Sequence, residues 1–164
     1  MVFCFIDETC KCFKDGCSSY TFNVISPRVN WKESRKLCQE TARGDLVSME
    51  SDAEWTFLKI TILNLTKADD YFIGLKKGVQ SREWRWLSNK SAMNTTQKRW
   101  SQGEPSGDGN CVVMMRRDYL RQYGKYYDLD CLKRFTSGYI CERPVESCNK
   151  GMTYTFYMYT LQST

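Results

Sequence analysis

Nine cysteines in a chain of 164 residues constrain this sequence more than any other feature. So many thiols are typical of an oxidising compartment, where disulfides form, unless the cysteines bind metal or carry out redox chemistry. Neither exception fits, because the chain has no histidine and its later cysteines lack the C-x-x-C spacing of zinc sites. Cys10 and Cys12 could form half of a metal site, but no second pair of similar spacing completes it. We therefore expect a disulfide-stapled domain.

Three N-glycosylation sequons, which begin at Asn64, Asn89 and Asn94, indicate the same compartment. The chain is thus predicted to be extracellular, either secreted or part of the ectodomain of a cell-surface protein. The first ten residues lack the basic and apolar regions of a signal peptide. Since no run reaches the roughly 20 apolar residues that span a bilayer, no membrane anchor is expected within this chain.

The net charge of +5 is modest and comes from short clusters of lysine and arginine. A nucleic-acid-binding domain usually shows a longer basic stripe and a matching motif, so nucleic acid is not expected as a partner. A protein or a glycan, including an anionic or sulfated glycan, remains open as the ligand.

The hydrophobic pattern predicts two helices followed by several strands, which is typical of an α+β domain. Asn30 and Glu33 can cap a first helix that ends near Gly44, and residues 51–54 form a capping box for a second helix that closes near Asn64. Strands are predicted at residues 20–24, 46–49, 71–75, 84–87, 111–115, 126–127 and 139–141. Residues 89–110 form a long polar segment, and long loops inside compact domains are usually functional.

We divide the chain into an irregular cysteine-rich lead-in (1–16), a central domain (17–143) and a tail (144–164). The pattern of the last fourteen residues leaves a strand, an interface and disorder all open.

The order of landmarks in the central domain resembles that of the C-type lectin-like domain over roughly residues 17 to 143. The landmarks are Trp31, Cys38, Phe72-Ile73-Gly74-Leu75, Trp84-Arg85-Trp86, Gly103-Glu104-Pro105, Cys111, Tyr126-Tyr127-Asp128, Cys131 and Cys141. The resemblance implies two helices packed on antiparallel sheets with a long loop region. It also implies disulfides between Cys38 and Cys141 and between Cys111 and Cys131.

The resemblance further places Cys17 where longer family members carry the second cysteine of an N-terminal hairpin bridge, with Cys4 or Cys10 as its partner. Spacing alone leaves the pairings among the remaining cysteines open: Cys4, Cys10, Cys12, Cys17 and Cys148. Because nine is odd, one thiol is left over, and it could form an intermolecular bridge. The oligomeric state is not predicted.

Sugar-binding family members hold calcium with a Glu-Pro-Asn motif, a later acidic residue and an Asn-Asp pair. In this sequence Ser106 replaces the asparagine of the first motif, and Tyr127 precedes Asp128 in place of the second asparagine. The remaining candidate calcium ligands are Glu104, Ser106, Asp108 and Asp128. Because calcium takes about 6 to 8 oxygen ligands, this set predicts a weak, degenerate calcium site.

Two functions follow. One is calcium-assisted glycan binding through Glu104, Asp108 and Asp128. The other, which the composition favours, is calcium-independent recognition of a protein or glycan ligand. Its candidate contacts combine tyrosine and arginine, as interface hot spots do: Arg116, Arg117, Tyr119, Arg121, Tyr123, Tyr126 and Tyr127.

An enzyme is not expected. The chain has no histidine to act as a general base, and no serine or cysteine lies in a recognisable nucleophile motif.

Overall fold

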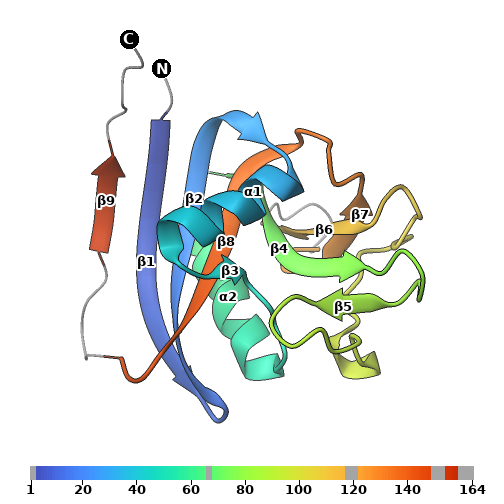
Figure 1. Cartoon of the computed structure of the whole chain (residues 1–164), viewed down its shortest axis with the longest axis horizontal. Coiled ribbons are helices and arrows are strands. Elements are labelled where there is room, and N and C mark those ends of the chain that lie inside the picture. Colours follow the sequence, from blue (N-terminus) through green and yellow to red (C-terminus); the bar gives the residue numbers. More distant parts are fainter. Residues whose placement is uncertain (1–2, 66–67, 117–121, 149–153, 159–164) are drawn as a thin grey trace.

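A computed structural model describes residues 3–65, 68–116, 122–148 and 154–158 of the chain (Figure 1). Side chains are described within these ranges except at residues 3–7, 137 and 154–158. In chain order the elements are β1 (Phe3–Phe13), β2 (Gly16–Val29), α1 (Trp31–Leu37) with a π-helical turn (Cys38–Ala42), β3 (Asp45–Leu46), α2 (Asp52–Asn64), β4 (Asp70–Lys77), β5 (Trp84–Trp86), a 3-10 turn (Thr95–Gln97), β6 (Cys111–Met115), β7 (Tyr126–Leu129), β8 (Thr136–Val145) and β9 (Tyr154–Met158).

Both helices begin at the residues that the sequence predicts. The Asn30 side chain accepts a hydrogen bond from the Glu33 amide, and the Glu33 carboxylate accepts one from the Asn30 amide, which completes a capping box. Ser51 caps α2 by accepting from the Glu54 amide at 3.2 Å. The Glu54 carboxylate does not close the predicted box, because it accepts from the Glu50 amide.

The strands form one mixed sheet in the order β7-β6-β4-β8-β2-β1-β9, with β3 paired to β8 and β5 paired to β4. The prediction of antiparallel sheets is therefore correct for every pair except one, because β4 and β8 run parallel. β8 lies between β4 and β2 in the sheet and pairs antiparallel with β2.

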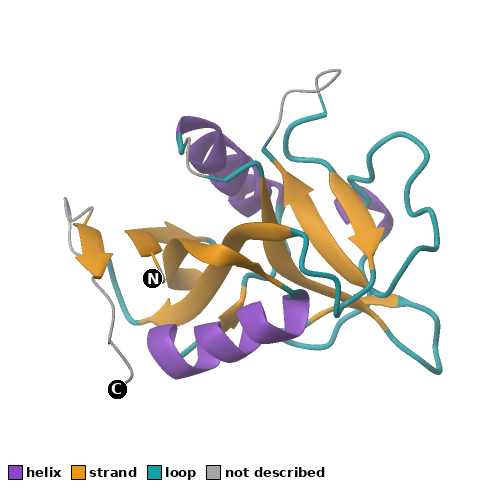
Figure 2. Ribbon diagram, turned by 90° about the horizontal axis from the view of Figure 1, so that it is seen from above, coloured by secondary structure: helices purple, strands orange, loops and turns teal. Residues whose placement is uncertain are grey.

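The two helices lie on either side of the strands (Figure 2), so the sheet is buried on both faces and the core has two parts. Leu58 and Ile62 of α2 pack in one cluster, and Trp31 and Cys38 of the first helical segment pack in the other. The first six residues of β4 are buried, and the last five of these, residues 71–75, form an uninterrupted apolar run, as in a strand covered on both faces. No helix in the described part of the chain is long and apolar enough to cross a membrane.

The prediction of an irregular lead-in over residues 1–16 is wrong. Residues 3–13 form β1, which pairs with β2 from Phe3 opposite Ser26 to Phe13 opposite Gly16. Gly16 has a φ of 142°, a backbone conformation that glycine adopts readily, and it closes the hairpin. β9 pairs with the other edge of β1, which makes part of the tail a strand. The strand predicted at residues 46–49 shortens to Asp45–Leu46.

Four disulfides cross-link the described residues. Cys38 is joined to Cys141 and Cys111 to Cys131, which are the two pairings that the family resemblance implies. The predicted partner of Cys17 is wrong, because Cys17 is bonded to Cys12. The β1–β2 register places these two residues directly opposite each other, with their Cα atoms 3.9 Å apart. The fourth bridge joins Cys10 to Cys148.

Candidate functional site

The long loop between β5 and β6 is anchored to the scaffold at both ends. At its far end, the Lys77 amide donates to the Asn110 carbonyl at 2.8 Å, and the Cys111–Cys131 disulfide follows. Nearer its start, the buried Gln97 side chain accepts from Trp86 Nε1 at 3.1 Å and donates to the Glu50 carbonyl at 2.6 Å. The loop is therefore held by side chains of the core as well as by its own turns.

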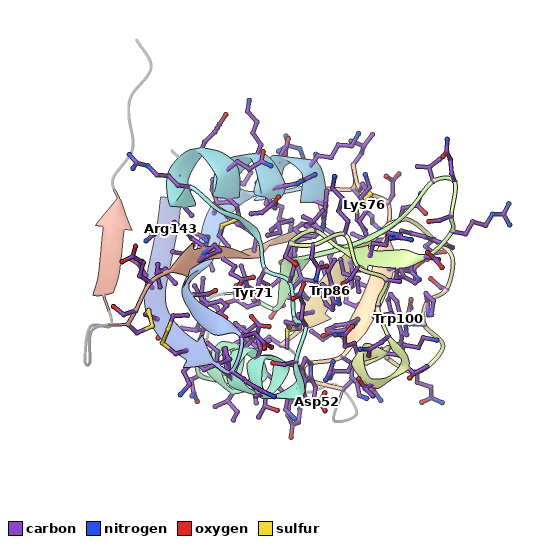
Figure 3. All side chains as sticks on the ribbon, turned by 60° about the horizontal axis from the view of Figure 1, so that its bottom comes forward. Asp52, Tyr71, Lys76, Trp86, Trp100 and Arg143 are labelled. Carbon is purple, nitrogen blue, oxygen red and sulfur yellow. A yellow bond between two sulfur atoms is a disulfide. The ribbon has the colours of Figure 1, made fainter. Side chains whose placement is uncertain are left out.

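Four aromatic rings form the floor beneath this loop. Trp84 packs against Trp100 with ring centroids 4.9 Å apart, and Trp100 meets Tyr126 edge-on at 6.1 Å. Trp86 meets Tyr126 in the same manner at 6.4 Å. Figure 3 shows Trp86 and Trp100 in the same half of the molecule. Trp84 and Trp100 are only half-buried, so part of each ring is open to solvent.

Asp128 on β7 organises the tip of the loop. Its Oδ1 accepts from the Ser106 amide at 2.7 Å and from the Ser106 hydroxyl at 3.1 Å. Its Oδ2 accepts from the Gly107 amide at 3.0 Å and from the Gly109 amide at 3.3 Å. The Asp128 side chain is 3% exposed. A single buried carboxylate thus gathers three backbone amides and one hydroxyl of the segment from Ser106 to Gly109.

The two glycines allow the backbone to make this turn. Gly107 has a φ of 90°, a region that favours glycine. A Cβ atom at Gly109 would lie 2.0 Å from the backbone carbonyl of Leu129, so a side chain there would push the loop off β7. Both positions therefore bring amide groups within reach of Asp128.

Glu104 lies beside this carboxylate. Its Oε2 accepts from the Ser106 amide at 3.0 Å and from the Asp128 amide at 3.4 Å. Burial raises the pKa of Glu104, and the hydrogen bond with the Asp128 side chain raises it further. Burial acts in the same direction on Asp128, but hydrogen bonds from Glu104 and from the loop outweigh it and lower the Asp128 pKa. Asp128 is therefore the stronger acid of the pair.

This arrangement does not fit a calcium ion. A carboxylate offers about four lone-pair positions, and all four positions of Asp128 accept hydrogen bonds from the loop. Calcium would have to displace these donors, whose partial positive charges point into the same space. One oxygen of Glu104 is also occupied by amide donors. What remains falls well short of the 6 to 8 oxygens that calcium prefers.

Of the four predicted calcium ligands, the structure brings Glu104, Ser106 and Asp128 together. Asp108 is exposed and takes no part in their hydrogen bonds. Among the described residues, one group of three candidate metal ligands has donor atoms within 4.8 Å of one another. It consists of disulfide-bonded cysteines: Cys12, Cys17 and Cys148. The amides of Gly107 and Gly109 could not be predicted, because backbone donors have no side-chain signature in a sequence. The only hint of them is the glycine-rich stretch in which they lie.

The predicted ligand-binding tyrosines and arginines that the structure describes do not form one surface. The prediction for Tyr126 is wrong, because its side chain is fully buried and its hydroxyl donates to Met49 Sδ at 3.7 Å. Alternation along β7 turns Tyr127 to the other face, where it donates to Asp70 Oδ2. Tyr123 lies under Lys59 Nζ, and Arg116 donates to the Ala68 carbonyl. Arg117, Tyr119 and Arg121 lie outside the described residues.

The three sequon asparagines are exposed. Asn64 ends α2, Asn89 accepts from the Ser91 amide, and Asn94 caps the 3-10 turn.

A second acidic cluster lies beside a cavity of about 300 Å³. Glu54, 7% exposed, accepts from the Tyr20 hydroxyl at 2.7 Å. Burial raises the pKa of Glu54 to about 7, and the nearby charge of Glu142 raises it too, against the hydrogen bonds from Tyr20 and the Glu50 amide. Burial also raises the pKa of Glu142. The native domain therefore retains protons here that an unfolded chain releases.

Because of this cluster, we expect the free energy of unfolding of the domain to fall as pH rises. Below about pH 4.3 both states bind the Glu54 proton, and its stabilisation is fully present. Between about pH 4.3 and 7 only the native state binds it, so its contribution is lost as pH rises through the native pKa. We expect the unfolding free energy to decline by about 2 to 3 kcal/mol more in the native sequence than in Glu54→Gln. Urea denaturation in calcium-free buffer from pH 4 to 8 measures this difference. Glu40→Gln, at an exposed site, serves as control, and identical slopes in the native chain and Glu54→Gln would refute the prediction.

Comparison with known proteins identifies a single family over most of the chain. A family model described as "Lectin C-type domain" matches residues 27–143. The C-type lectin lectoxin-Phi1 of Philodryas olfersii is 30% identical over 117 residues, which cover 69% of this chain and 71% of the relative. Lithostathine of Rattus norvegicus is 32% identical over 126 residues, covering 75% and 73%. The C-type lectin domain of murine dendritic cell inhibitory receptor 2, solved in complex with N-glycan, superposes with a TM-score of 0.65. It is 26% identical and covers 83% of this chain and 96% of that one.

Proposed function

The chain belongs to the C-type lectin domain family, and on that premise we propose that it is an extracellular recognition module that works without calcium. It binds a protein or glycan ligand through the long loop and the adjacent strands. Its role is binding rather than catalysis, in keeping with the absence of histidine from the sequence. Asn64, Asn89 and Asn94 are its proposed glycosylation sites.

One observation carries this proposal. The Asp128 carboxylate accepts hydrogen bonds from Ser106, Gly107 and Gly109, so the protein supplies its own anion to order the loop from within. A cation is not needed to gather these groups. Because the loop is ordered before a ligand arrives, less conformational entropy is lost on binding.

A glycan ligand is supported by the family and by the composition of the loop floor. The structurally similar domain of murine dendritic cell inhibitory receptor 2 is described in complex with N-glycan, at 26% identity to this chain. Here the half-buried rings of Trp84 and Trp100 offer apolar faces beside exposed polar residues of the loop. Sugar rings present apolar faces of a comparable kind.

A binding screen with and without calcium tests the proposal. The native chain is applied to a glycan array and to cell-surface proteins, in millimolar calcium and in chelator. We expect the same ligands in both conditions, and a melting temperature that changes by less than about 1 °C. A calcium site filled to one hundred times its dissociation constant would stabilise the domain by about 2.7 kcal/mol.

The matched variants are Asp108→Ala and Glu104→Gln. Asp108 is exposed, and Glu104 would have to be a ligand in any calcium-dependent site. Two results together would refute the proposal and make the protein a calcium-dependent lectin. Chelator would abolish binding, and calcium would raise the melting temperature of the native chain but not that of Glu104→Gln.

A further inference from the structure

The net charge of the chain is concentrated in one segment. Residues 76–98, here called the basic segment, comprise the end of β4, β5 and the first half of the long loop. They contain one acidic residue, Glu83, and six basic ones: Lys76, Lys77, Arg82, Arg85, Lys90 and Lys98. The rest of the chain contains 18 basic and 18 acidic residues. A surface that carries the whole excess charge of a domain attracts ligands of opposite charge.

Pairing between β4 and β5 brings positive charges of the basic segment still closer together. Lys76 and Arg85 are directly opposite each other in the β4–β5 register, so both side chains lie on the same face. Like charges in that position destabilise a strand pair. Glu83 compensates Arg85 through an ion pair at 2.6 Å, while Lys76 Nζ lies 5.6 Å from the centroid of the Trp31 ring. The segment therefore contains more cationic groups than its own acidic residue can neutralise.

Three of the remaining cations are open to solvent, and a fourth lies beside the loop floor. Arg82, Lys90 and Lys98 are exposed. Lys77 Nζ lies 5.7 Å from the centroid of the Trp84 ring, which packs against Trp100. In Figure 3, Lys76 and Trp100 lie on the same side of the molecule, opposite Arg143. The basic segment thus combines exposed charges with the partly exposed ring of Trp84.

We propose that the basic segment binds a sulfated glycan chain. This inference rests on the proposed function and names the ligand class of the same site. Separate ammonium and guanidinium groups suit a polymer whose charges are spaced along its length, and the partly exposed rings of Trp84 and Trp100 suit sugar rings. The chain shows no nucleic-acid-binding motif, which disfavours a nucleic acid as the polyanion.

The test measures the affinity for a heparin-derived oligosaccharide in chelating buffer, on the enzymatically deglycosylated protein. The variant Arg82→Gln, Lys90→Gln, Lys98→Gln removes three positive charges from the basic segment. The control Lys11→Gln, Lys14→Gln, Lys32→Gln removes three from exposed positions elsewhere, so the net charge is equal. We expect the dissociation constant to rise about tenfold in the first variant and to change by less than about twofold in the control. Binding should also weaken with added salt and disappear with desulfated heparin.

Three results would overturn the inference. They are equal weakening in both variants, binding of single-stranded DNA as tight as that of heparin, and no measurable binding of sulfated glycans. If a neutral glycan or a protein still bound independently of calcium, the proposed function would stand and only the assignment of the basic segment would fail. Loss of every ligand in chelator would instead contradict the proposed function itself.

Discussion

Replacing Cys38 and Cys141 together by alanine is expected to lower the free energy of unfolding by about 5 kcal/mol. The two cysteines are 103 residues apart, so their bond closes a loop that spans most of the domain. Closing a loop of about 100 residues removes unfolded-state entropy worth about 4.7 kcal/mol in the chain-entropy model. Both cysteines are buried in the core cluster on the α1 side, so packing is lost as well. The melting temperature should fall by about 10 °C or more.

The matched control replaces Cys12 and Cys17 by alanine. Their sequence separation is five residues, and the β1–β2 hairpin already places them opposite each other. We expect a loss of about 2 kcal/mol or less. Thermal and urea denaturation under non-reducing conditions measure both variants. Equal losses in the two variants would show that the long bridge does not hold the domain as described.

Asp128→Ala is expected to cost about 3 kcal/mol and to release the tip of the long loop. The substitution leaves the amides of Ser106, Gly107 and Gly109 without their acceptor. A fully buried donor left unsatisfied costs about 1 to 3 kcal/mol, and because Ser106 and Gly107 are exposed, water recovers part of that cost. The control Asp108→Ala removes an exposed carboxylate from the same loop and should cost less than about 0.5 kcal/mol.

Acid provides an independent check on Asp128. Its pKa is lowered in the folded state, mainly by hydrogen bonds from Glu104 and the loop acting against burial. A lowered pKa contributes stability that is present above the unfolded value of about 3.9 and is lost as pH falls through the native pKa. Asp128→Ala should therefore flatten the acid limb of the stability profile, and an unchanged acid limb would contradict this role.

Sequence patterns predicted the elements that depend on local signals. The capping residues Asn30 and Ser51 start the two helices, and the apolar run at Phe72-Ile73-Gly74-Leu75 lies in the core. Gly74 permits close approach of backbone, since a Cβ there would lie 2.3 Å from the Leu46 carbonyl oxygen. These features follow from periodicity and sterics within short stretches, which a sequence displays directly.

The features that could not be predicted depend on pairing between distant segments. In β1, apolar and polar residues show little regular alternation, and its strand conformation follows from its pairing with β2 and β9. The same register, rather than spacing, pairs Cys12 with Cys17. Asp128 could be singled out from the sequence, but not its hydrogen-bond partners, because backbone amides of a distant loop leave little signal in the sequence. Tyr126 was misassigned because composition does not show which face of β7 a side chain occupies.

Amide hydrogen exchange in the long loop tests the central claim most directly. The amides of Ser106, Gly107 and Gly109 are followed by NMR in millimolar calcium and in chelator, for the native chain, Asp128→Ala and Asp108→Ala. If Asp128 orders the loop in place of a cation, these amides are protected equally in both conditions, and Asp128→Ala alone removes the protection. Protection that appears only in calcium and vanishes in chelator would contradict the account.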